Sequence, residues 1–78
     1  MEFFTARCLR RGMISIDGSY QGENKDGNTL RIFQCPAGLH DITLEYRSGQ
    51  TSHKQTRRVM ITGTNAIVPM AIAFIAKL

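Results

Sequence analysis

The chain has 78 residues, a formal net charge of +4 and an apolar fraction of 42%. This length fits one domain, and the apolar fraction is too high for a disordered chain. The longest apolar run, residues 66–76, is too short to cross a bilayer as a helix, which takes about 20 residues, so we expect no membrane span.

Short segments of alternating or β-rich character, bounded by glycine, proline or polar runs, predict an all-β fold. In chain order the expected strands cover residues 3–9, 13–17, 19–22, 29–35, 40–47, 55–62 and 66–76. The expected turns and loops lie at 17–18, 23–28, 36–38, 48–53 and 63–65. We expect a small antiparallel β-sandwich or partly open barrel of six to seven short strands, forming one domain over residues 1–78. Residues 1–11 fit either a lead-in strand or a mobile arm.

Two reversals carry the strongest local signals. Asp17-Gly18 predicts a tight hairpin turn, because glycine adopts positive φ without steric cost. The run 36–38, Pro-Ala-Gly, predicts a second reversal, because proline presets its own φ. Residues 40–47 then alternate strictly, which is typical of a strand with one buried and one solvated face.

The order and spacing of these pieces resemble the PEGA domain, a small bacterial and archaeal β-sandwich module. The family reads apolar-x-apolar-Asp-Gly, then Gly, then Pro-x-Gly-x-His before an alternating strand, then two closing strands joined by a glycine turn. The matching positions are Ile14, Ile16, Asp17, Gly18, Gly22, Pro36, Gly38, His40, Ile42, Leu44, Val59, Ile61, Gly63 and the run from Ala66. The family's leading Pro-x-Gly-Ala is absent, and residues 48–50 replace its Gly-Tyr. The resemblance implies a non-catalytic adhesion or interaction module, often outside the cytoplasm, with no active site.

Basic residues gather in the second half of the chain, since residues 46–78 contain no acid. Arg and Lys attract phosphates without reading sequence, so a basic face here could bind nucleic acid or an acidic protein. A solvated rim is the other interpretation. The candidate basic face comprises Arg47, Lys54, Arg57 and Arg58. A single-strand binder would also need exposed aromatic rings, for which Tyr20, Phe33 and Tyr46 are the candidates.

The C-terminal segment is apolar on both faces, which is unusual for a terminal strand of a small sandwich. Pro69 cannot donate to a sheet, so this strand should lie at an edge or begin its pairing after Pro69. Either the fold covers both faces, or one face meets a partner protein or a second copy of the chain. The candidate partner-binding residues are Val68, Met70, Ile72 and Phe74.

Chemistry-bearing residues are few and scattered. Cys35 and His40 flank one turn, but a histidine there is most simply a residue whose ring caps the turn, and no metal-ligand spacing is present. Cys8 and Cys35 fit either one disulfide or two buried small side chains. We therefore expect no enzymatic activity, cofactor or metal.

The expected function is non-catalytic protein association, including self-association through the C-terminal strand. The alternative is a small β-barrel that binds nucleic acid through residues 47–58. The compartment stays open, because no signal peptide is visible at the start. The family resemblance favours an extracytoplasmic location, whereas free cysteines favour the cytoplasm.

Overall fold

The computed structural model describes residues 1–75, which contain strands and no helix. In chain order the strands are β1 (Glu2–Arg7), β2 (Met13–Ile16), β3 (Ser19–Glu23), β4 (Lys25–Asp26), β5 (Thr29–Leu30), β6 (Phe33–Cys35), β7 (Gly38–Ser48), β8 (Thr51–Ile61) and β9 (Met70–Ala73). The predicted all-β class is confirmed. The chain has more strands than expected, because β4 forms inside the expected loop 23–28 and the expected strand 29–35 divides into β5, which pairs with β4, and β6.

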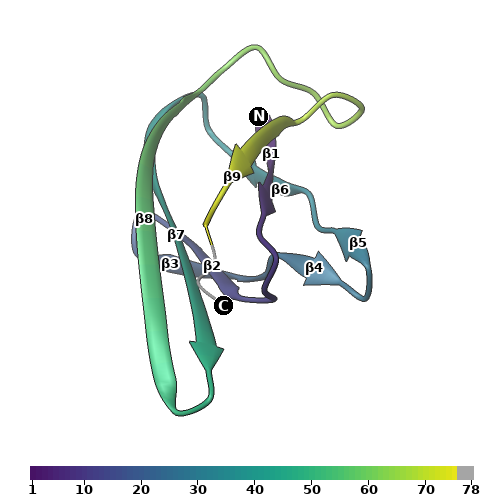
Figure 1. The fold of residues 1–78 in the computed structure, drawn as a ribbon. Helices are drawn as coiled ribbons and strands as arrows, with labels where there is room; N and C mark the ends of the chain where they lie inside the picture. Colours follow the sequence, from purple (N-terminus) through teal and green to yellow (C-terminus); the bar gives the residue numbers. More distant parts are fainter. Residues whose placement is uncertain (76–78) are drawn as a thin grey trace.

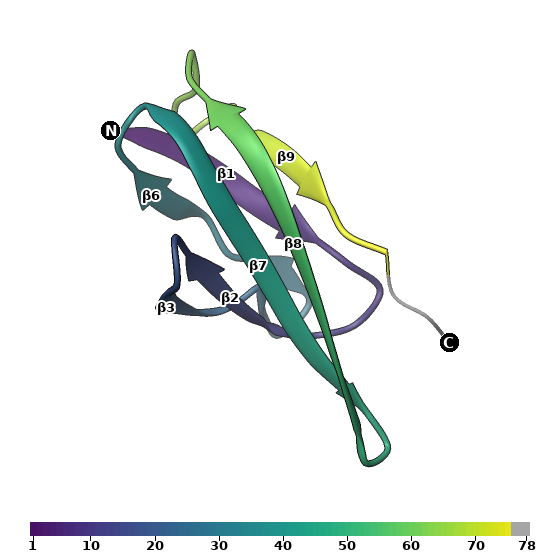
Figure 2. The same cartoon turned by 90° about the vertical axis from the view of Figure 1, so that its left-hand side faces the viewer.

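Two sheets form the layers of the fold (Figure 1). One has the order β3-β2-β7-β8, and the other has the order β6-β1-β9. Their inner faces share one hydrophobic core, so the molecule is a sandwich, and the sheets do not close into a barrel over residues 1–75. The long β7–β8 hairpin extends beyond the rest of the molecule (Figure 2).

The core takes the side chains that alternate inward from both layers. In the four-stranded sheet these come from the β2, β7 and β8 positions that the period-two pattern predicted as buried. The buried apolar residues are Phe4, Ala6, Cys8, Ile14, Ile16, Phe33, Cys35, Ile42, Leu44, Tyr46, Ile61, Ile72 and Phe74. Cys8 and Cys35 are both free thiols within this set, which selects the second of the two interpretations of the cysteines.

The turns show why the hairpins have these lengths. Asp17 (φ 50°) and Gly18 (φ 86°) both have positive φ, which is type I′ geometry and confirms the tight turn that the sequence predicted. At the tip of the β7–β8 hairpin, the prediction of a loop over residues 48–53 is wrong. Gly49 has φ 64°, which permits a two-residue turn, so pairing begins at once with Ser48 opposite Thr51.

Both ends of the described chain enter the three-stranded sheet. β1 is its central strand, between β6 and β9, so residues 2–7 form a strand rather than a mobile arm. β9 is an edge strand that begins directly after Pro69, as expected from the missing proline N–H. β9 pairs with β1 in parallel, which differs from the expected antiparallel arrangement. The connection that follows β8 explains this direction. Thr64 in that connection is hydrogen-bonded to Glu2 at the start of β1, so β9 begins beside the start of β1 and runs in the same direction.

Asn24 joins the two layers and has no exposed surface. Its side-chain oxygen accepts from the Gly12 N–H (2.9 Å), and its amide donates to the carbonyls of Ala6 (3.3 Å) and Arg10 (3.2 Å). Its backbone N–H donates to the Gly12 carbonyl, and its carbonyl accepts from the Arg31 N–H. The sequence predicts a polar loop at residues 23–28 and does not indicate that Asn24 is buried.

Candidate functional site

The predicted basic face does not form as one surface. Opposite residues of β7 and β8 place Arg58 beside Asp41, and Lys54 beside Glu45, on the outer face of the sheet. The Arg58 guanidinium donates to the Asp41 carboxylate from Nε (2.8 Å) and Nη2 (3.3 Å). The acids of β7 therefore offset much of the positive charge that the sequence concentrates after residue 46.

Arg47 and Arg57 complete the predicted set, and they lie on different faces. Arg47 lies opposite Ser52 and points outward with Lys54 and Arg58. Arg57 follows the opposite alternation and points inward with Ile42, where its Nη1 donates to the carbonyl of Ala73 on β9 (2.8 Å). The single basic face is therefore corrected to three outward cations and one inward cation.

The predicted apolar partner surface also divides. Ile72 (2% exposed) and Phe74 (6% exposed) belong to the core, and Met70 packs against it. Val68 is 67% exposed and lies in the connection before β9. The physical reason is alternation: the large even positions of β9 fill the sandwich, and the exposed odd positions are the small Ala71 and Ala73. Ile72 and Phe74 are thus not available to a partner on the surface of this chain.

Side chains from β8 bind backbone groups at the end of β9 and just after it, a feature that the sequence did not indicate. The Gln55 amide donates from Nε2 to the Ile75 carbonyl and accepts at Oε1 from the Ile75 N–H, both at 3.0 Å. This is the bonding that a neighbouring strand would supply. Together with the Arg57–Ala73 bond, it occupies backbone groups that would otherwise be exposed at this edge.

The edge of β8 is different, because no strand of the described chain pairs with its outer side. Asp41 on β7 directs both backbone groups at Asp17, its N–H to the carboxylate and its carbonyl to the N–H, each at 2.8 Å. Asp41 and Arg58 are therefore a non-hydrogen-bonded pair, and the backbone groups of Arg58 point away from β7. By alternation, the outward-pointing backbone groups belong to Ser52, Lys54, Thr56, Arg58 and Met60. We call these five residues the free edge of β8.

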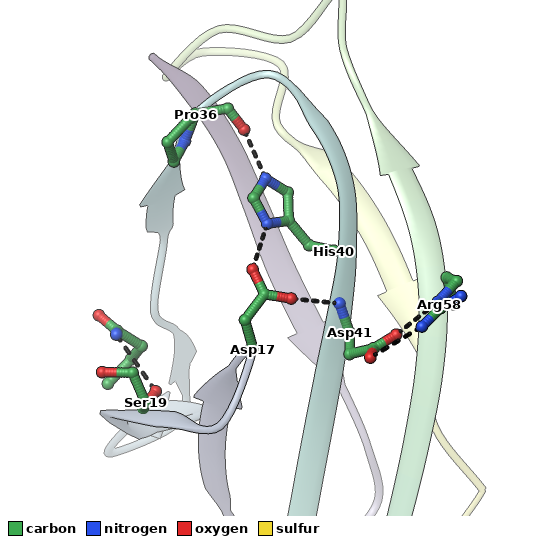
Figure 3. A network of polar contacts seen from close by, with 7 residues as sticks. Asp17, Ser19, Pro36, His40, Asp41 and Arg58 are labelled. Carbon is green, nitrogen blue, oxygen red and sulfur yellow. Dashed lines mark hydrogen bonds and ion pairs between the residues drawn. The ribbon is translucent and has the colours of Figure 1, made fainter.

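A polar node joins the β2–β3 turn to the start of β7 (Figure 3). His40 Nδ1 lies 2.7 Å from Asp17 Oδ2, and His40 Nε2 lies 2.7 Å from the Pro36 carbonyl. Both neighbours are acceptors, and a neutral imidazole has only one N–H, so the geometry fits the doubly protonated ring. This matches the expectation that His40 caps the turn.

The ionised groups at this node stabilise one another in their charged forms. The hydrogen bond that His40 donates to the Asp17 carboxylate, followed by the one that it donates to the Pro36 carbonyl, raises the pKa of His40. The Asp41 backbone N–H and then His40 lower the pKa of Asp17. The guanidinium of Arg58 lowers the pKa of Asp41 by hydrogen bonding. An imidazolium held between two oxygens has no lone pair to take a proton, so His40 in this state is no general base.

The thiol of Cys35 lies in an environment that disfavours reactivity. It is buried, and burial is the main cause that raises its pKa. A thiolate, which is the nucleophilic form, is therefore disfavoured there. Among residues 1–75 no group of three or more His, Cys, Asp or Glu side chains is arranged to hold a metal ion.

An open cavity of about 410 Å³ lies beside the end of β1, at a place that the sequence analysis did not indicate. Two cations, Arg7 and Lys25, border a mostly apolar lining. The other lining residues are Cys8, Leu9, Asn28, Leu30, Ala73 and Phe74. None of the predicted site residues except Phe74 reaches it.

Comparison with known proteins gives no relative. No family model, no curated protein and no solved structure matches this chain. The likeness to the PEGA domain therefore stays a prediction. The described part of the chain contains no helix long and apolar enough to span a membrane.

Proposed function

We propose that the chain is a non-catalytic module that associates with other proteins through the β7–β8 hairpin. The observation that carries the proposal is the free edge of β8, an 11-residue strand paired on one side only. Strand edges bind extended segments of other chains through backbone hydrogen bonds. Natural sandwiches usually cover, shorten or twist so long an edge, as Gln55 and Arg57 do for β9.

The contacts around the C-terminal strand β9 give less support to protein association through that strand. Ile72 and Phe74 are buried in the core, and side chains of β8 bind the Ala73 carbonyl and both backbone groups of Ile75. Nucleic-acid binding also has less support, because Phe33 and Tyr46 are buried and cannot stack on bases. Tyr20 is the aromatic candidate that stays exposed, at 60%.

A site-specific photocrosslink tests the proposal. A benzophenone side chain placed at Thr56, in the middle of the free edge, is compared with the same group at Tyr20 on β3. Irradiation in the cells that make the protein should give protein adducts at position 56 that are missing at position 20. Adducts that are equal at both positions, or none at either, would contradict the proposal.

A salt titration separates the nucleic-acid alternative. A binder that neutralises phosphates loses affinity steeply as salt rises. We expect no measurable binding of a single-stranded polynucleotide even at low salt. Tight binding that weakens with salt and is lost on replacing Arg47 and Lys54 by glutamine would favour the alternative instead.

A further inference from the structure

We propose that the free edge of β8 binds an acidic, extended segment of a partner protein, which adds to the sheet as a fifth strand beside β3-β2-β7-β8. This inference rests on the proposed function and names the chemistry of the partner. The edge supplies N–H donors and C=O acceptors from Ser52, Lys54, Thr56, Arg58 and Met60. Their spacing along β8 matches the ladder that an extended peptide needs.

The charge of β8 selects an acidic partner. The strand contains Lys54, Arg57 and Arg58 and no acid, and the outward Lys54 and Arg58 lie opposite Glu45 and Asp41 of β7. Lys54 and Arg58 point to the outer face, so residues of an added strand on that face would lie next to them. The Asp41 carboxylate engages two guanidinium nitrogens of Arg58, whose side chain is 67% exposed. Because a guanidinium has five N–H donors, Arg58 can also bind a carboxylate of the added strand.

The same charges oppose a second copy as the occupant. A two-fold antiparallel pairing over the full length of β8 is centred on Thr56. That centre places Lys54 of one copy directly opposite Arg58 of the other. Like charges opposite one another in a sheet are destabilising, so the edge disfavours itself and favours an acidic chain.

The probe for this inference is a blocked peptide of alternating threonine and glutamate, matched in length to β8. A peptide of alternating threonine and lysine is the charge-reversed control. Binding is measured by fluorescence anisotropy, and amide hydrogen exchange locates it. We expect the acidic peptide to bind more tightly than the basic control peptide. We also expect its affinity to fall as salt rises. We also expect it to slow exchange at the free-edge amides, with Thr56 at the centre.

Two changes in the chain sharpen the test. An amide-to-ester replacement of the Gln55–Thr56 bond removes the outward N–H of Thr56 and also weakens the Gln55 carbonyl as an acceptor toward β7, and it should weaken binding about fivefold to tenfold. Thr56→Val keeps that N–H and loses only the hydroxyl bond to Thr43, so it serves as the matched control and should bind like the parent. Lys54→Glu should weaken the binding of the acidic peptide about threefold or more. Circular dichroism verifies that each variant keeps its sheet.

Three results would overturn the inference: no binding of the acidic peptide at millimolar concentration, equal binding of both peptides, or an ester variant that binds like the parent. Dimers of the chain alone that are held together by β8 would also overturn it. If crosslinks at position 56 persist while the peptides fail, protein association stands and the acidic strand does not. If the crosslinks are also missing, the proposed function fails with it.

Discussion

Replacing Asn24 by alanine tests whether one buried amide holds the two layers of the sandwich together. The substitution leaves the buried Gly12 N–H without its acceptor, which costs about 1–3 kcal/mol. It also removes the donors to the Ala6 and Arg10 carbonyls, each worth about 0.5–1.5 kcal/mol. The expected loss is about 2–6 kcal/mol. A domain of this size is stable by only about 4–12 kcal/mol, so the loss is a large share.

Urea unfolding followed by circular dichroism measures this loss. We expect a lower midpoint with an unchanged slope, and a fall in Tm of roughly 8–48 °C, at about 4–8 °C per kcal/mol. Asn28→Ala is the matched control, because Asn28 is an exposed asparagine of the neighbouring turn. Asn24→Asp keeps an acceptor for Gly12 but points a buried carboxyl oxygen at the Ala6 and Arg10 carbonyls, so it should destabilise the fold at least as much as alanine. An Asn24→Ala variant within about 0.5 kcal/mol of the Asn28 control would refute the reasoning.

Three further predictions follow from the same structure. Because the pKa of His40 is raised in the folded state, the stabilisation by His40 is fully present below its ordinary pKa of about 6.5 and is lost as pH rises through the folded-state pKa. The urea midpoint should therefore fall as pH rises, and His40→Gln or Asp17→Asn should flatten this dependence. Gly18→Ala should lower stability by about 1–2 kcal/mol in thermal unfolding because φ is 86°, and a wild-type Tm would contradict the turn geometry. Leu44→Ala should cost about 2–5 kcal/mol in urea, because Leu44 has no exposed surface, whereas Leu39→Ala, at a residue 54% exposed on the same strand, should stay within about 0.5 kcal/mol.

Local chemistry made much of the fold predictable. The Asp17-Gly18 pair determines a type I′ turn because few residues tolerate positive φ at both positions. Strict alternation through Ile42 and Leu44 determines which side of β7 is buried. Pro69 determines where β9 starts, since a residue without an N–H cannot enter a regular ladder. Each of these signals acts within a few residues of chain.

The candidate site was less predictable, because it depends on which distant strands become neighbours. Alternation sends the adjacent Arg57 and Arg58 to opposite faces, but the sequence could not show that the register places Arg58 beside Asp41 or that Arg57 reaches Ala73 in the other sheet. Nor could it show that the amide of Asn24 replaces water around three backbone groups.

What the sequence determined by itself is the pleated backbone, the positions of its reversals and the inward set of side chains. Tertiary structure alone decided the parallel β1–β9 pairing, the side-chain bonds to backbone groups at the end of β9, and the exposure of the outer edge of β8. The physical reason is that burial and turn geometry act through each residue's own side chain and φ. An edge, by contrast, is defined only by which other segment lies beside it.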